Sequence, residues 1–155
     1  MNKKLINLVV NGEEKEFSIL PNEKLLEVLR REGYKGTKFG CGEGSCGSCT
    51  ILLEGKPVYS CTMFAFQAAG KKIETIEGVG TAKNPHVIQR ALIDQGAVQC
   101  GFCMPGIILS AKSMFEENSD PDEEYIRTHM DGNLCRCTGY EKILTALENV
   151  AAVNK

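Results

Sequence analysis

The sequence lacks long apolar runs, blocks of like charge and low-complexity segments. No window approaches the roughly 20 apolar residues that a membrane-spanning helix needs. The first residues do not resemble a signal peptide, because the apolar run over residues 5–10 is short and is broken by Asn7. A net charge of −2 argues against nucleic acid as a partner, since that partner requires a basic face. We therefore expect a cytoplasmic protein with no membrane span.

Histidine is also scarce, and the two that occur, His86 and His129, stand alone on segments that we expect to be helical. We interpret both as surface or interface residues rather than metal ligands. The remaining composition, 43% hydrophobic and 25% charged, is ordinary for a globular protein. A length of 155 residues accommodates one domain or two small ones.

Cysteine, by contrast, is abundant: the eight cysteines fall into two sets of four. The first set has the spacing C-x4-C-x2-C, with a fourth cysteine after eleven further residues, and consists of Cys41, Cys46, Cys49 and Cys61. The second set has two close pairs separated by 31 residues, and consists of Cys100, Cys103, Cys135 and Cys137. The first spacing is that of plant-type ferredoxins, which hold a [2Fe–2S] cluster by four thiolates. Two complete sets predict two clusters and an electron relay.

Other uses of cysteine fit this pattern less well. Disulfides suit small secreted domains, and the same density in a reducing compartment usually indicates metal. Zinc is a serious alternative, because each C-x2-C pair resembles half of a zinc site, but zinc does not account for Cys41. A thioredoxin-like redox pair leaves two cysteines of each set unexplained. The spacing of the second set is by itself less diagnostic than that of the first.

Glycines surround the first set and favour a cluster there. Residues 39–49 read FGCGEGSCGSC, with glycine beside almost every ligand. Glycine permits positive φ and close approach, so backbone N–H groups can point at an anionic cluster. The same stretch matches G-x-G-x-x-G, but a strand-like TILL follows instead of a helix, so we reject a dinucleotide site.

The N-terminal half has the pattern of a β-grasp fold. Residues 5–10 and 15–20 flank Asn11-Gly12, a strong hairpin turn signal. Asn22 is a candidate cap for a following helix with leucines at helical spacing. A second hairpin is expected over residues 50–59, and a last strand over residues 72–76.

From about Gly80 the pattern becomes helical. Asn84-Pro85 and Asp120-Pro121 are typical helix starts, and two more helices are expected after Pro105 and after Tyr140. Four short helices predict a bundle, with the second cysteine set at helix junctions. We therefore expect an α+β protein: a plant-type ferredoxin β-grasp domain over residues 1–79 and a four-helix-bundle [2Fe–2S] domain over residues 80–155.

The second set lies in motifs that carry a resemblance. Residues 98–106 read VQCGFCMPG, residues 133–140 read NLCRCTGY, and residues 43–50 read EGSCGSCT. Together these three motifs, in this order, resemble the small iron–sulfur subunit of the molybdenum hydroxylases, the xanthine dehydrogenase, aldehyde oxidoreductase and carbon monoxide dehydrogenase family. The resemblance covers nearly the whole chain and assigns the second set to a second [2Fe–2S] cluster.

The resemblance implies a hetero-oligomer in which this chain transfers electrons. A large partner subunit would hold molybdopterin and hydroxylate the substrate, and an FAD subunit or an external acceptor would take the electrons last. The chain itself has no nucleophile–base pair and no substrate-pocket motif, so it is expected to contain no catalytic residue of its own. The substrate class stays open among purines, nicotinate-type heterocycles, aldehydes and carbon monoxide, with a weak preference for purines.

The resemblance also implies two contacts to the pterin of the partner subunit, one from Gln99 and one from Cys137. The amide of Gln99 suits a pterin edge, because it offers a donor and an acceptor together. One residue departs from the family pattern: Met104 replaces the usual threonine after Cys103. Arg136, between two ligands, faces either the cluster or a partner, and the sequence does not decide between these.

Two other functions remain open from the sequence. A free two-cluster ferredoxin would shuttle electrons among several partners, and a zinc-bound structural module would transfer none. Zinc sites are colourless, and a free ferredoxin would purify without molybdopterin.

Overall fold

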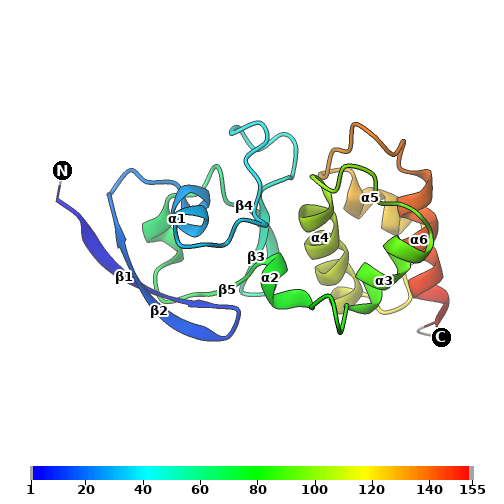
Figure 1. The fold of residues 1–155 in the computed structure, drawn as a ribbon, viewed down its shortest axis with the longest axis horizontal. Helices are drawn as coiled ribbons and strands as arrows, with labels where there is room; N and C mark the ends of the chain where they lie inside the picture. The colour runs from blue at the N-terminus through cyan, green and yellow to red at the C-terminus, as the bar shows by residue number, and fades with distance from the viewer. Residues whose placement is uncertain (1, 154–155) are drawn as a thin grey trace.

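The computed structural model describes residues 2–153 of the chain. A five-stranded mixed sheet with the order β2-β1-β5-β3-β4 lies at one end of the molecule, and a group of helices lies at the other (Figure 1). The predicted α+β class, with a sheet-containing half followed by a helical half, is confirmed.

The sheet half consists of two hairpins and one crossing helix. Its elements are β1 Lys4–Val10, β2 Glu13–Ile19, α1 Leu25–Arg31, β3 Thr50–Leu53, β4 Lys56–Tyr59, the short 3₁₀ helix η1 Ala65–Ala68 and β5 Lys72–Glu74. The Asn11-Gly12 turn has φ values of 53° and 84°, which are those required by a two-residue hairpin turn. Buried residues of α1, including Leu25 and Leu29, pack on strand residues such as Phe17 to form one core. This is the β-grasp arrangement that the sequence predicts.

The helical half surrounds a second core. Its elements are α2 Ile76–Val79, α3 Val87–Asp94, α4 Met104–Glu117, α5 Glu123–Met130 and α6 Glu141–Val153. Helices α3 to α6 contribute buried residues such as Leu92, Ile107, Ile126 and Leu147 to a single cluster. The predicted four-helix bundle is thus present, with the one-turn helix α2 leading into it.

Strand β3 joins the two halves. All four of its residues are buried, whereas a strand with one solvated face alternates in exposure. Ile51 and Leu53 belong to the core beneath α1, and Leu52 belongs to the helical core. The sheet therefore packs against α1 on one face and against α4 on the other, which brings the loops at its edge close to the helix ends.

Two predicted helix caps were wrong. Lys24, not Asn22, is the N-cap of α1, because the first N–H groups of the helix donate to Met63 O and Ser60 O, which removes the need for a capping side chain. His86, not Asn84, is the N-cap of α3, and its Nδ1 accepts from the N–H of Ile88.

Three other element ends also differ from expectation. The cap of α5 is Asp122, whose carboxylate accepts from the Tyr125 N–H at 2.8 Å. The last strand stops at Glu74 instead of residue 76, because Ile76 begins α2. Helix α4 begins at Met104, so Pro105 lies inside its first turn instead of before it.

Within residues 2–153, no helix combines the length and apolar character needed to cross a bilayer. The outer limits of the two expected domains, residues 1 and 155, lie outside the described residues.

Candidate metal centres

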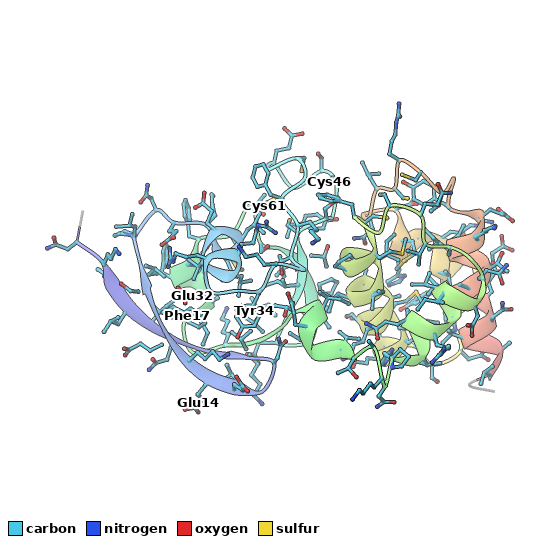
Figure 2. All side chains as sticks on the ribbon, in the orientation of Figure 1. Glu14, Phe17, Glu32, Tyr34, Cys46 and Cys61 are labelled. Atoms are coloured by element: carbon cyan, nitrogen blue, oxygen red, sulfur yellow. The ribbon has the colours of Figure 1, made fainter. Side chains whose placement is uncertain are left out.

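The first cysteine set lies where the sheet meets the helices. Cys41 and Cys46 are in the loop between α1 and β3, Cys49 immediately precedes β3, and Cys61 follows β4. Figure 2 labels Cys46 and Cys61. Cys49 and Cys61 are buried and pack with Leu26 of α1, while Cys41 and Cys46 are partly exposed. The fold thus brings residues from both sides of the β3–β4 hairpin to one end of the sheet.

Backbone N–H groups point at the sulfur of Cys41. The N–H groups of Ser45 and Glu43 donate to its Sγ at 3.3 and 3.5 Å, and glycines with positive φ at 42 and 44 shape this turn. Hydrogen bonding from Ser45 and from the Glu43 N–H lowers the pKa of the Cys41 thiol to about 5. The thiolate is the metal-binding form of cysteine, so this turn is suited to a ligand.

Gly40 leaves space for another ligand. A Cβ at this position would lie 2.7 Å from Cys46 Sγ and 3.2 Å from Ser48 Oγ. Any side chain there would displace the sulfur, so the loop is shaped around the cysteines.

Cys49 differs from Cys41 in its pKa. Burial raises the pKa of the Cys49 thiol to about 12. A bound cation would offset this desolvation cost by stabilising the thiolate.

The second set lies at helix ends in the other half. Cys100 and Cys103 precede α4, and Cys135 and Cys137 are in the loop between α5 and α6. The fold brings these two pairs together: the sulfurs of Cys137 and Cys100 are 3.6 Å apart, although the residues are 37 positions apart in the chain. Cys103 is buried, which raises the pKa of its thiol to about 12.

Thr138 and Tyr140 position Cys135. The Thr138 hydroxyl donates to Cys135 Sγ at 3.1 Å, and the N–H of Cys135 donates to the Tyr140 hydroxyl at 2.7 Å. Burial favours a higher pKa for the Cys135 thiol, but the hydrogen bonds from Thr138 and Cys137 lower it overall. The sequence patterns did not single out Thr138 or Tyr140 as partners of Cys135. The sequence signal that could have identified them is a side-chain hydroxyl within five positions of a cysteine ligand.

Among residues 2–153, no three or more His, Cys, Asp and Glu side chains converge on a position for a single metal ion. A structural zinc site gathers four ligands around one tetrahedral ion. A [2Fe–2S] cluster instead distributes four thiolates over two irons, so its ligands stand farther apart as two pairs. The thiols of each set interact in two pairs, which is the arrangement that a two-iron cluster needs. The pairs are Cys41 with Cys46 and Cys49 with Cys61 in the first set, and Cys100 with Cys137 and Cys103 with Cys135 in the second.

The surroundings of the second set are exposed. Gln99, Cys100 and Cys137 lie at the surface, next to apolar side chains that are 42–52% exposed, namely Val98, Phe102 and Leu134. Arg136 is also exposed, whereas Met104 is buried in the helical core. The methionine that departs from the family pattern therefore serves packing of α4.

The two histidines lie away from both cysteine sets. His86 is the N-cap of α3, and His129 on α5 packs its ring on Tyr125 with centroids 4.0 Å apart. Both side chains are partly buried and engaged within the helical half, in keeping with a structural role.

The sequence matches two protein families in succession. Residues 8–75 match the family described as "2Fe-2S iron-sulfur cluster binding domain", and residues 75–148 match the "[2Fe-2S] binding domain". The chain is 48% identical to the nicotinate dehydrogenase small FeS subunit of Eubacterium barkeri, over 95% of this chain and 94% of that subunit. The chain belongs to the small iron–sulfur subunits of the molybdenum hydroxylase family.

Two further comparisons extend this result across the family. The xanthine dehydrogenase iron-sulfur-binding subunit of Escherichia coli O157:H7 is 38% identical, over 92% of this chain and 91% of that one. The crystal structure of quinoline 2-oxidoreductase from Pseudomonas putida 86 contains a chain with a TM-score of 0.94 and 41% identity, covering 99% of this chain and 97% of that one. This molybdenum hydroxylase subunit is therefore an electron-transfer component of an oxidoreductase, with a ferredoxin-like domain and a second [2Fe–2S] domain.

Proposed function

We propose that this subunit carries two [2Fe–2S] clusters and relays electrons between a molybdopterin site in a large partner subunit and FAD in another partner. The observation that supports this most is that the chain has two four-cysteine sets whose loops meet, since the N–H of Leu134 donates to the carbonyl of Cys46. One set comprises Cys41, Cys46, Cys49 and Cys61, and the other comprises Cys100, Cys103, Cys135 and Cys137. Each bound cluster supplies a one-electron carrier. The protein holds the clusters, limits their exposure and sets their separation.

The exposed second set is the proposed entry point for electrons. Cys100 and Cys137 reach the surface, and the apolar side chains around them suit burial against a protein partner. We propose that Gln99 and Cys137 contact the pterin of the large subunit. The exposed amide of Gln99 is available to a ligand edge for this purpose.

The first set is the proposed exit point. Cys41 and Cys46 are partly exposed in a loop whose neighbour Phe39 is 61% exposed. An apolar ring beside a partly exposed ligand loop favours docking of a second partner, an FAD subunit, although an external acceptor would fit the same edge.

The exposed apolar side chains around the second set also bear on the free-ferredoxin alternative. A carrier that remains alone in solution gains nothing from Val98, Phe102 and Leu134 at its surface, whereas a permanent subunit buries them. The relatives are themselves named as subunits, which supports a hetero-oligomer.

We also propose that the two domains span residues 1–79 and 80–155. We propose that the complex is cytoplasmic, because thiols stay reduced in that compartment.

The substrate of the whole enzyme is set by the partner subunit. The relatives named for nicotinate and for xanthine are 48% and 38% identical, so identity does not favour the purine. The two names share a nitrogen heteroaromatic ring, and we propose a substrate of this class, with purines retained as one member.

Co-purification tests this proposal. A tagged chain isolated from its own host is expected to bring a large subunit, with molybdenum and FAD present on the same sample. The complex is then assayed with xanthine and with nicotinate, using a dye as electron acceptor. A chain that purifies alone with iron and without molybdenum would instead establish the free carrier.

Replacing Thr138 by valine tests the ligand role of Cys135. Hydrogen bonds to cluster sulfurs stabilise the reduced, more negative state. Loss of one bond worth about 1 kcal/mol corresponds to a potential lower by about 40 mV, since a tenfold change for one electron is about 59 mV. A redox titration followed by EPR measures the shift.

The matched control is Thr145→Val. The Thr145 hydroxyl donates to Glu141 O on α6, in the same half of the molecule but not to a cysteine. Its potentials are expected to equal those of the wild type. An unchanged potential in Thr138→Val would argue against Cys135 as a ligand.

A further inference from the structure

A backbone hydrogen bond connects the loops of the two cysteine sets. The N–H of Leu134 donates to the carbonyl of Cys46 at 2.9 Å. Cys46 belongs to the first set, and Leu134 directly precedes Cys135 of the second. A path of covalent bonds interrupted by a single hydrogen bond therefore runs from the sulfur of Cys46 to the sulfur of Cys135.

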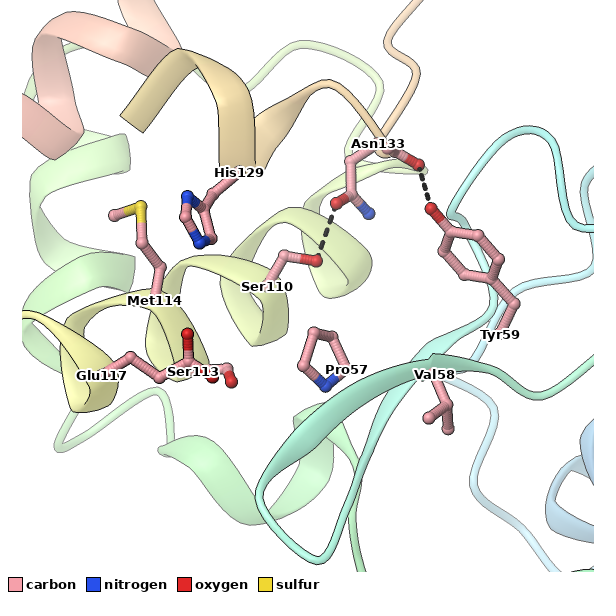
Figure 3. Close-up of a pocket in the computed structure, with 10 residues that line it drawn as sticks. Pro57, Val58, Tyr59, Ser110, Ser113, Met114, Glu117, His129 and Asn133 are labelled. Atoms are coloured by element: carbon pink, nitrogen blue, oxygen red, sulfur yellow. Dashed lines mark hydrogen bonds between the residues drawn. The ribbon is translucent and has the colours of Figure 1, made fainter. Parts of the chain in front are cut away.

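The buried side chain of Asn133 stabilises this contact between the loops. Asn133 is 4% exposed, and its Nδ2 donates to Gly47 O at 3.1 Å. Its Oδ1 accepts from Ser110 Oγ at 2.7 Å (Figure 3). Asn133 adjoins Leu134, and Gly47 adjoins Cys46. The amide thus ties together the residues flanking the hydrogen bond between the loops and anchors both to α4 through Ser110.

The packing around this amide leaves little room for movement. A Cβ on Gly47 would overlap Gly132 O and lie 2.6 Å from Asn133 Nδ2, and a Cβ on Gly106 would lie 2.9 Å from the same nitrogen. Tyr59 adds a bond from its hydroxyl to Gly132 O at 3.0 Å, at the edge of a cavity of about 180 Å³ between β4 and α4 (Figure 3). Close backbone approach therefore fixes the separation of the two loops.

We propose that Asn133 is a positioning residue for electron transfer between the two clusters. This inference rests on the proposed function, because it requires a cluster on each set. In the step concerned, one electron would pass from a cluster held by the second set to a cluster held by the first, so that the cluster on the second set loses and the cluster on the first set gains one electron, with no proton or bond transferred. Such transfer depends steeply on the gap between the bonded paths, and Asn133 holds that gap.

A simpler role for Asn133 would be to fasten the two domains. Ser113 provides the matched comparison, because its hydroxyl donates to Gly55 O at 2.9 Å across the same domain interface and it is 3% exposed. Ser113 lies on α4 like Ser110, but its bond reaches the β3–β4 turn rather than a cysteine loop. Ser113→Ala thus removes a buried interdomain bond without touching the contact between the loops.

The experiment uses the full chain with whatever subunits co-purify, as wild type and as Asn133→Ala, Asn133→Asp and Ser113→Ala. Asparagine to aspartate keeps the acceptor for Ser110 but removes the donor to Gly47. Two quantities are measured: the magnetic splitting of the EPR signals when both clusters are reduced, and the rate of intercluster transfer after flash photoreduction. Iron content and thermal unfolding are recorded alongside.

Both Asn133 variants are expected to keep two signals and full iron, but to show weaker splitting and a rate roughly tenfold lower, the scale of effect when a preorganised site loosens by a fraction of an ångström. Ser113→Ala is expected to lower the unfolding temperature and keep the wild-type rate. If an Asn133 variant fails to fold, Ser110→Ala, which frees the amide to rotate, is judged by the same criteria.

Two results would overturn the inference: wild-type splitting and rate in the Asn133 variants, or an equal slowing in Ser113→Ala. A wild-type protein with a single cluster signal would contradict the two-cluster proposal itself, which separates that failure from a failure of Asn133 alone.

Discussion

Replacing Cys61 by serine is expected to abolish one of two [2Fe–2S] signals and to remove about half of the bound iron, since each cluster needs four thiolates. A serine hydroxyl is a poor substitute, because soft thiolate ligands select iron–sulfur clusters. Cys61 is 5% exposed, so no water-filled opening compensates for the lost ligand. EPR of the reduced protein, with iron quantified on the same sample, measures the result.

Cys103→Ser is the reciprocal variant and is expected to abolish the other signal. Cys103 is 7% exposed and belongs to the second set, so the two variants match in chemistry and burial. Each variant controls for the other, because each should keep the signal that the other loses. Loss of the same signal in both variants would show that Cys61 and Cys103 serve one site, against the proposed division into two sets.

Gly47→Ala is expected to reduce the free energy of unfolding by about 3 kcal/mol or more, near the upper end for single substitutions. Two costs add at this position. Its φ of +70° is unfavourable by roughly 1–2 kcal/mol for a residue with a Cβ. The new Cβ would also collide with the carbonyl of Gly132 and crowd Asn133, so the loops of both cysteine sets must separate.

Gly55→Ala separates these two costs. Gly55 has a φ of +80°, but a Cβ there would have no heavy atom within 4 Å. This control should therefore lose only the conformational contribution, roughly 1–2 kcal/mol. Denaturant unfolding of both variants measures the difference. Equal destabilisation would mean that the close contact between the loops does not constrain the fold.

Local patterns in the sequence predict most of the elements correctly. Alternation and an Asn-Gly turn predict the first hairpin, and helical spacing of apolar residues predicts α3 to α6, because these signals depend on neighbours in the chain. Helix caps were wrong where tertiary contacts took over. The N–H groups at the start of α1 find carbonyls at Ser60 and Met63, far along the chain, so Asn22 is not needed there.

The candidate site divides in the same way. Cysteine spacing and the flanking motifs are local, so they predict both ligand sets, the family and the glycine-rich first loop. The hydrogen bond between Asn133 and Gly47 is not local, because the two residues lie 86 positions apart in the chain. The burial of β3 on both faces likewise depends on α4, and Leu52 shows no sign of it in its own neighbourhood. Contacts between the two halves therefore could not be predicted from local patterns in the sequence.

The central claim is that this chain holds two clusters on two separate cysteine sets. Low-temperature EPR of the dithionite-reduced protein, with iron and zinc quantified on the same sample, tests it most directly. We expect two distinguishable [2Fe–2S] signals and about four irons per chain, as two such clusters require. A colourless preparation that contains zinc and gives no signal would contradict it.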